Sequence, residues 1–283
     1  MPPVRLRQIA FITHDLEKER HKLTEVFSTE VIYADPAVAQ WGLKNFLVSL
    51  GGDFLEVCAP VQPDTSVGRL LDKRGDGGYM IIMQTEDAAA RRAFIETNGL
   101  AKVIHSHSSD DADCVQYHPK GIKGGIMPEL DTQHPSPDHP SPLTTRLSHW
   151  HACGPSSRYA AYLPAMQLTS HLALSRLALR LAPGNADVVG AAAQWSELFG
   201  IARGDAAGEL AFADGVKVEF LAGEEGKREG LEEVRVDVRG RDKLMEMLGR
   251  ASRLGLCGDG WIRMVGVRWV FLLVGSDGKR SYL

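Results

Sequence analysis

The apolar and polar positions of this chain change their period several times along the sequence. Residues 7–14 alternate as a strand does, and residues 16–27 then place apolar side chains at helical spacing. Asp15 precedes the helical run and is a suitable N-cap. Strand-like runs follow at 31–35, 44–50 and 53–60, separated by Asp-Pro and Gly-Gly turn pairs. The pattern predicts a strand, a helix and three strands.

The same order is predicted once more, and two similar units with two strands after the helix follow. The second unit has a strand at 78–87, a helix at 88–100 and strands at 101–105, 113–119 and 124–131. The third has a strand at 175–183, a helix at 186–200 and a strand pair at 208–223; the fourth has a strand at 232–240, a helix at 241–255 and strands at 261–265 and 268–275. We therefore expect an α+β protein of four βαβββ units. Two units would form a strongly curved mixed sheet in each of two domains, residues 1–131 and 174–283.

Residues 132–173 interrupt this rhythm. The stretch 132–145 is rich in Pro, Ser and His, so we expect a linker there without regular structure. The pattern leaves the form of 156–172 undecided.

The repeat can be tested by aligning the sequence of one half of the chain with that of the other. Residues 45–60 align with 208–223 without a gap, and Glu219 then falls under Glu56. Gln8 lies seven residues before Asp15, as Met80 lies seven before Asp87.

Glu56 sits among apolar residues of a predicted strand, and two interpretations stay open. Either it faces solvent, or it faces a cavity and needs a positive partner.

Composition narrows the class of protein. The chain has 283 residues, a formal net charge of −4 and 44% hydrophobic residues, so nothing favours nucleic-acid binding. No apolar run is long enough for a membrane span, and we see no secretion signal at the start of the sequence. The four cysteines are far apart, which favours free thiols in a reducing, cytoplasmic compartment.

Two stretches together carry a resemblance. FLEVCAP (54–60) and YHPKGIKGGIMPEL (117–130), with the glycine-rich GDGGY (75–79) between them, resemble the vicinal oxygen chelate superfamily. This superfamily includes glyoxalase I, methylmalonyl-CoA epimerase, bleomycin-resistance proteins and extradiol dioxygenases. The likeness is best over residues 5–131, and it implies paired βαβββ units.

The resemblance also implies a divalent-metal site with two ligands from each unit. Carried over by position, the ligands fall on Gln8, Glu56 and Glu129. The fourth position, where the family has His, falls on Met80, or on Tyr79 if the register differs by one. The ion would be Ni, Mn, Co, Zn, Mg or Fe, unless the protein holds no metal. In the second half the equivalent positions are Arg176, Glu219, Glu233 and Val270, where we expect an internal ion pair in place of a metal.

The leading function that the resemblance implies is a glyoxalase- or epimerase-like lyase or isomerase acting on a small carbonyl metabolite, with Glu129 and Glu56 as the catalytic carboxylates. The alternative is a metal-free small-molecule-binding protein of the bleomycin-resistance type. In either case the ligand cleft would be lined by Tyr79, Met80, His118, Trp41 and Phe46. An extradiol dioxygenase is disfavoured because no His falls at the strand positions that its iron needs. We expect a small-molecule partner, no nucleic acid or membrane, and either a monomer or a homodimer.

The ten histidines raise a separate zinc hypothesis. His105 and His107 could share one face of a strand, as could His149 and His151, with Cys153 close to the second pair. No second cluster has the spacing of a zinc finger, so the sequence favours ordinary histidines over a zinc site.

Overall fold

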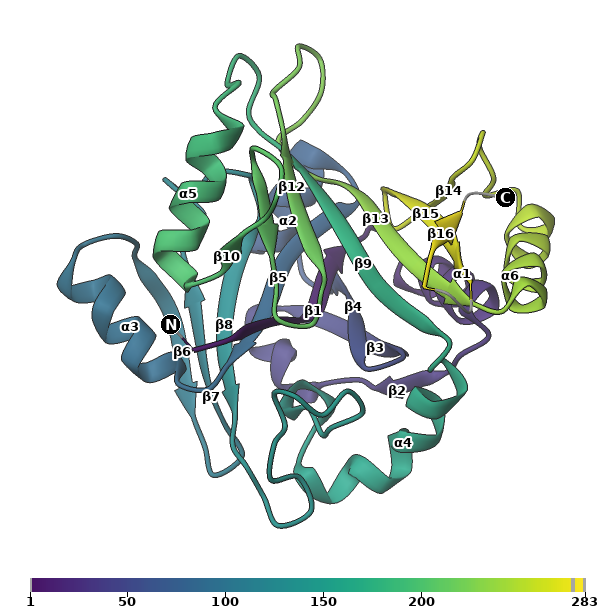
Figure 1. Cartoon of the computed structure of the whole chain (residues 1–283), viewed down its shortest axis with the longest axis horizontal. Coiled ribbons are helices and arrows are strands. Elements are labelled where there is room, and N and C mark those ends of the chain that lie inside the picture. Colours follow the sequence, from purple (N-terminus) through teal and green to yellow (C-terminus); the bar gives the residue numbers. More distant parts are fainter. Residues whose placement is uncertain (1, 276–277, 282–283) are drawn as a thin grey trace. The chain divides into compact units, whose positions relative to one another are not determined.

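The strands of the computed structural model, which describes residues 2–275 and 278–281, form two mixed sheets (Figure 1). The first sheet has the strand order β2-β3-β4-β1-β5-β8-β7-β6. Its strands are β1 (Val4–Ile12), β2 (Val31–Tyr33), β3 (Leu43–Leu50), β4 (Asp53–Pro60), β5 (Gly77–Thr85), β6 (Val103–Ser108), β7 (Ala112–Tyr117) and β8 (Met127–Gln133).

The second sheet has the order β10-β11-β12-β9-β13-β15-β14, with β16 paired to β15. Its strands are β9 (Leu172–Arg180), β10 (Ala202–Arg203), β11 (Glu209–Ala211), β12 (Lys217–Leu221), β13 (Gly230–Arg239), β14 (Ile262–Met264), β15 (Val267–Val274) and β16 (Arg280–Ser281). The predicted α+β class with two mixed sheets is confirmed.

The helices begin where the sequence offers a cap. Asp15 accepts a hydrogen bond from the Lys18 amide at the start of α1, as predicted. The α-helices are α1 (Leu16–Phe27), α2 (Ser66–Arg74), α3 (Ala88–Thr97), α4 (Tyr159–Leu168), α5 (Val188–Phe199) and α6 (Arg241–Arg253). Short 3₁₀ turns form η1 (Pro36–Trp41), η2 (His151–Cys153) and η3 (Ser156–Arg158). None of the described helices combines the length and the apolar character that a membrane crossing requires.

Two helices lie where the sequence pattern predicted none. Helix α2 begins at the Thr65 cap, whose side chain accepts from the Gly68 amide, and ends at Gly75. Helix α4 lies within the segment 132–173 and contains Pro164. A proline inside a helix removes one backbone donor, which is why the pattern left this stretch undecided.

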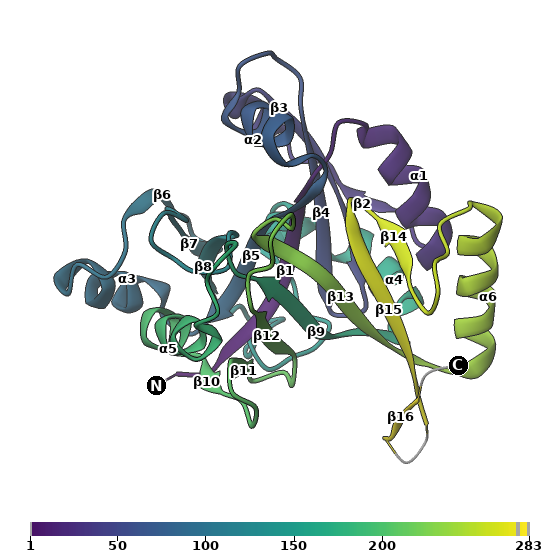
Figure 2. The same cartoon turned by 90° about the horizontal axis from the view of Figure 1, so that it is seen from above.

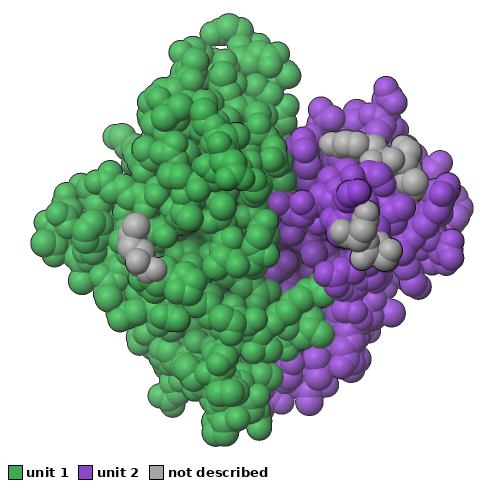
Figure 3. Space-filling model, viewed as in Figure 1, with its two compact units in different colours: residues 1–8, 79–151, 176–232 green, residues 9–78, 152–175, 233–283 purple. Residues whose placement is uncertain are grey.

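The chain forms two compact units, and each takes segments from both halves of the sequence (Figure 3). The first unit comprises residues 1–8, 79–151 and 176–232; the second comprises 9–78, 152–175 and 233–283. The strands of the first sheet all come from residues 4–133 and those of the second from 172–281. The division into domains 1–131 and 174–283 remains a prediction.

An aromatic cluster fills the core of the first unit. Trp195 of α5 packs against Phe199 and Phe220, with ring centroids 5.3 and 6.1 Å apart, and Phe199 in turn meets Tyr117 of β7 at 5.5 Å. The Trp195 indole donates to the Lys123 carbonyl at 2.9 Å. Large rings of this kind contribute much of the apolar area that a core buries.

The loop before β8 approaches this core closely. Gly125 has φ of +61°, and a Cβ there would lie 2.5 Å from Cγ of Glu229. Only glycine combines that conformation with so little space, so the GG pair before β8 serves packing.

A second aromatic cluster fills the core of the other unit. Trp269 of β15 packs against Phe11 and Phe27, each with ring centroids 5.7 Å away. Helices α1 and α6 lie side by side in this unit (Figure 2), and the Arg250 side chain donates to the Val26 carbonyl at the end of α1.

Asp76 holds the junction between β1 and α1. Its carboxylate accepts from the Thr13 hydroxyl at 2.8 Å and from the His14 amide at 3.0 Å, and His14 Nδ1 lies 2.7 Å away. Burial raises the pKa of Asp76, but the hydrogen bonds from His14 and Thr13 outweigh burial and hold the pKa below its usual value.

We expect the Asp76→Asn variant to be less stable than the wild type by about 1–2 kcal/mol at pH 7, because hydrogen bonds to a charged acceptor are stronger than neutral ones. The folded-state pKa is depressed, so this advantage is present above pH 4 or so and is lost as pH falls through the folded pKa. Urea unfolding at pH 7 and pH 3 measures the difference. Exposed Asp72→Asn is the control and should change stability by less than about 0.5 kcal/mol. If Asp76→Asn lowered the free energy of unfolding by the same amount at pH 7 and pH 3, the role of Asp76 as a charged acceptor would be contradicted.

Candidate functional site

Strands β5, β8 and β7 of the first unit place a group of polar side chains on one face of the sheet. Glu129 lies opposite Ile82 of β5 and Gln116 of β7. Asp131 lies opposite Gln84 of β5 and Cys114 of β7. Because paired residues point to the same side of a sheet, these side chains share what we call the Asp131 face, defined by Gln84, Cys114, Gln116, Glu129 and Asp131.

Two carboxyl groups lie together on the Asp131 face. Glu129 is 8% exposed and Asp131 is fully buried. Burial, with the charge of Asp131, raises the pKa of Glu129 well above its usual value, and burial raises the pKa of Asp131 to about 8. The two carboxyl groups lie on the same face of β8, so each one disfavours ionisation of the other. The pair therefore holds at least one proton near neutral pH.

A histidine and a cysteine adjoin this pair. Nε2 of His151 lies 2.9 Å from Oδ2 of Asp131. Sγ of Cys114 lies 3.6 Å from Nδ1 and 3.8 Å from Nε2 of the same imidazole. Burial, followed by the nearby carboxylates, raises the pKa of Cys114, so this group is a thiol in the absence of a cation.

His151 lies in the segment 132–173, for which the sequence predicted no regular unit. We call residues 142–151 the strap. Ser148, His149 and Trp150 are all buried, and the His151 amide donates to Oε1 of Gln133 at 2.7 Å. The Trp150 indole donates to Oε1 of Gln8 at 2.7 Å. The strap thus packs on strands of the first unit, although residues 142–150 lack helix or strand.

Two arginines of β1 anchor the strap. Arg7 is fully buried and donates to the Ser148 carbonyl at 2.7 Å, the Ser148 hydroxyl at 3.1 Å and the Arg146 carbonyl at 3.3 Å. Arg5 donates to the carbonyls of Thr145 and Arg146. These bonds satisfy backbone groups that regular structure leaves without partners.

The predicted metal ligands do not fit a divalent-metal site as they stand. Gln8 offers an amide oxygen that already accepts a hydrogen bond from the Trp150 indole. The fourth position, Met80, is a buried thioether, which is a poor ligand for a hard or borderline ion. Glu56 belongs to the second unit, where Oε1 accepts from Asn45 Nδ2 at 2.6 Å and from the Cys58 thiol at 3.3 Å. The roles of Gln8, Glu56 and Glu129 as ligands remain predictions.

The predicted cleft residues are distributed over both units. Tyr79, Met80 and His118 lie in the first unit, and His118 Nδ1 accepts from the Lys120 amide. Trp41, 45% exposed, and Phe46, buried, lie in the second unit. Their role in ligand binding also remains a prediction.

The second half of the chain contains the predicted ion pair. Arg176 contacts Glu219 at 2.7 Å and also Glu209 at 2.8 Å. Glu233 instead lies near Arg235 and Arg268 in the second unit. The expectation that Arg176 pairs with a carboxylate is confirmed, and Glu209 is a partner that the sequence did not indicate.

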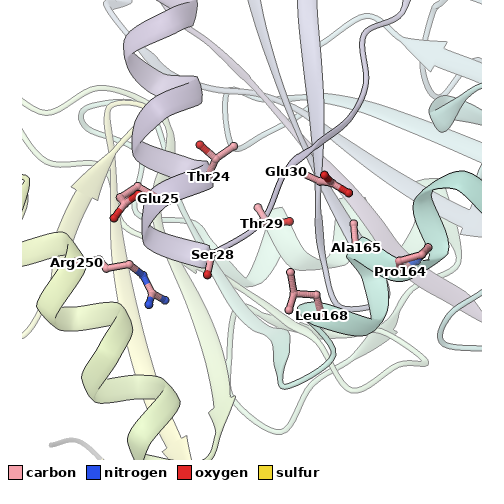
Figure 4. Close-up of a pocket in the computed structure, with 9 residues that line it drawn as sticks. All are labelled: Thr24, Glu25, Ser28, Thr29, Glu30, Pro164, Ala165, Leu168 and Arg250. Carbon is pink, nitrogen blue, oxygen red and sulfur yellow. The ribbon is translucent and has the colours of Figure 1, made fainter.

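A hollow of about 670 Å³ lies in the second unit, away from all these residues (Figure 4). It is lined by the end of α1 and the following residues, by α4 and by Arg250 of α6. None of the predicted site residues lines it.

Sequence reasoning did not find Gln84, Cys114 or Asp131, and it grouped His151 with His149 and Cys153. Among the described residues, His151 instead forms a group with Cys114 and Asp131 whose potential ligand atoms all lie within 4.8 Å of one another. One available signal was the period of β8, which places Asp131 two residues after Glu129 and therefore on the same face.

Comparisons with known proteins were made for the whole chain. No family model matches it, and no curated protein matches it. A variant methylmalonyl-CoA epimerase from Streptomyces coelicolor, in complex with 2-nitronate-propionyl-CoA, is 24% identical over 46% of this chain and 98% of its own, with a TM-score of 0.40. Methylmalonyl-CoA epimerase from Mycobacterium tuberculosis is 18% identical over 46% of this chain and 88% of its own, with a TM-score of 0.41.

A hypothetical protein from Staphylococcus aureus matches over almost the full length. It is 9% identical and covers 95% of this chain and 99% of its own, with a TM-score of 0.62. This likeness concerns the fold, and it extends over both sheets.

We expect Arg7→Met to loosen the strap, because the buried Ser148 carbonyl loses its 2.7 Å donor and the Arg146 carbonyl keeps only the bond from Arg5. The free energy that holds the strap on the sheet should fall by about 2–4 kcal/mol, in the range for breaking buried hydrogen bonds to a charged group. Tryptic cleavage after Arg146 should become at least about tenfold faster, since the rate follows the population of the open form. Arg20→Met, whose parent side chain is 52% exposed, is the matched control. Unchanged cleavage in Arg7→Met would show that Arg7 does not anchor the strap.

Proposed function

We propose, from the resemblance of residues 54–60 and 117–130 to the vicinal oxygen chelate superfamily, that this chain is an isomerase-like protein that moves a proton at a carbon next to a carbonyl group of a small metabolite. Glu129 is the group that carries the proton. A lyase of the glyoxalase type uses the same proton transfer and belongs to the same proposal.

The observation that supports the proposal is the position of Glu129. Its carboxyl group is buried on the Asp131 face, two residues from Asp131 on the same strand and opposite Gln116 of β7. A proton-transfer residue needs a second group within hydrogen-bond reach that can hold or return the proton. We assign this part to Asp131, which shares the face with Glu129 and lies 2.9 Å from Nε2 of His151.

The strap supports the same chemistry by excluding water. Trp150 is fully buried beside Gln8, so the face around Glu129 is shielded from solvent. A shielded site strengthens electrostatic interactions and protects a reactive enolate. The proposal assigns no step to a metal held by Gln8, Glu56 and Glu129, because those donors fit such an ion poorly.

Solvent exchange tests this proposal without a known substrate. The protein is incubated in D₂O with a panel of small carbonyl compounds that carry a C–H next to the carbonyl, including hemithioacetals of 2-oxoaldehydes and branched acyl thioesters. Proton NMR follows the loss of that C–H signal. We expect exchange with at least one compound, and a reduction of about 10²- to 10⁴-fold in Glu129→Gln, as is typical for loss of a general acid or base.

Glu86→Gln is the matched control, because Glu86 is an exposed glutamate just after β5. It should leave the exchange rate unchanged. Equal exchange by wild type and Glu129→Gln would contradict the role of Glu129. Binding of a panel compound without any exchange would favour the metal-free binding protein instead.

A further inference from the structure

We propose that Cys114, Asp131 and His151 bind one borderline transition-metal ion, with zinc as the best match. This site differs from the set Gln8, Glu56 and Glu129 that the family resemblance implies. It shares the Asp131 face with Glu129 but uses a histidine from the strap.

The donor atoms are already gathered. Sγ of Cys114, a ring nitrogen of His151 and a carboxylate oxygen of Asp131 all lie within 4.8 Å of one another. In a tetrahedral zinc site, bond lengths of about 2.3 Å to sulfur and 2.0–2.1 Å to nitrogen place the two donors about 3.5 Å apart. The observed separation from Sγ to Nε2, the nitrogen that faces Asp131, is 3.8 Å, and that to Nδ1 is 3.6 Å.

One contact would have to open. His151 Nε2 and Asp131 Oδ2 are 2.9 Å apart, which is a hydrogen-bond distance. Two ligands of one zinc ion lie about 3.3 Å apart. An ion therefore replaces this hydrogen bond after a shift of a few tenths of an ångström and a turn of the imidazole.

The fold holds each donor independently. Cys114 and Asp131 are direct neighbours across the β7–β8 pair. His151 is fixed through its amide, which donates to Gln133 of β8, and through Trp150, whose ring centroid lies 4.4 Å from the imidazole. Donors on a sheet and on an anchored segment need little ordering when an ion binds.

Gln84 provides a second, separate observation. It is 1% exposed, and neither Oε1 nor Nε2 has a hydrogen-bond partner among the described residues. It lies opposite Asp131 on β5 and so faces the same side of the sheet. Burying an amide without hydrogen-bond partners costs free energy. A water bound to an ion at the Asp131 face would be a hydrogen-bond partner for the Gln84 amide.

The donor set selects the type of ion. One thiolate, one imidazole and one carboxylate suit Zn²⁺ or Co²⁺, whereas Mg²⁺ and Ca²⁺ take oxygen ligands. Binding displaces the thiol proton of Cys114 to solvent, and the cation offsets the buried charge of Asp131. Three protein ligands with an open fourth position is the pattern of catalytic zinc sites. The proposal that an ion binds here does not depend on the proposed function. Only a catalytic role for the open fourth position rests on that function.

Co²⁺ titration of the full, reduced and untagged chain tests the site, because cobalt replaces zinc and absorbs visible light. We expect one Co²⁺ per chain, with tetrahedral d–d bands and a thiolate-to-cobalt charge-transfer band in the near ultraviolet, both removed by one equivalent of Zn²⁺. Cys114→Ser should abolish the charge-transfer band and weaken binding at least about 100-fold, more than the loss of an outer-shell partner costs. His151→Gln and Asp131→Asn should weaken binding to a similar extent.

Cys257→Ser is the matched control, because Cys257 is an exposed thiol away from this face. It should bind cobalt as the wild type does. No stoichiometric cobalt on the folded wild type would overturn the proposal whatever the variants do. A charge-transfer band that survives in Cys114→Ser would overturn it as well. Glu129→Gln should retain cobalt, so a failure here is distinguishable from a failure of the exchange experiment.

Discussion

The structure depends on two aromatic cores that neither half of the sequence can complete alone. In the second unit, Trp269 near the C-terminal end packs on Phe11 and Phe27 near the start. In the first unit, Trp195 and Phe199 of α5 pack with Phe220 and with Tyr117 of β7. Each cluster buries rings that contribute several kcal/mol apiece. The strands that carry the candidate site keep their positions because these cores close around segments far apart in the chain.

The candidate site contains other side chains and contacts than the ligand set that the resemblance implies. The resemblance led us to expect ligands on strands, and Gln8 and Glu129 do lie on strands of the first unit. Their surroundings differ from the expected ones, because the Trp150 indole donates a hydrogen bond to Gln8 and a second buried carboxyl group, Asp131, lies on the same face as Glu129. A scaffold of this kind hosts many chemistries, and the strap is the element of this chain that changes the local donor set.

The secondary structure could be predicted from the sequence wherever apolar period and caps agreed. Helix α1 with its Asp15 cap and strand β4 with Glu56 at its centre are examples. Helix α4 could not be predicted because Pro164 obscured its pattern. The meeting of His151 with Asp131 could not be predicted either, since it depends on where buried Arg7 holds the strap. No local pattern encodes that docking, which joins residues about 140 positions apart in sequence.

The interleaved cores have a consequence for how the chain is made. Phe11 leaves the ribosome long before its ring partner Trp269, which lies far along the sequence. Contacts between residues far apart in sequence slow folding. The entropy of the long loop is lost before the contacts that offset this loss have formed. Until then the apolar rings of the early segments stay exposed. Nascent chains of this protein therefore hold Phe11 and Phe27 without their ring partner until Trp269 has been synthesised, and they are open to aggregation or chaperone binding during that time.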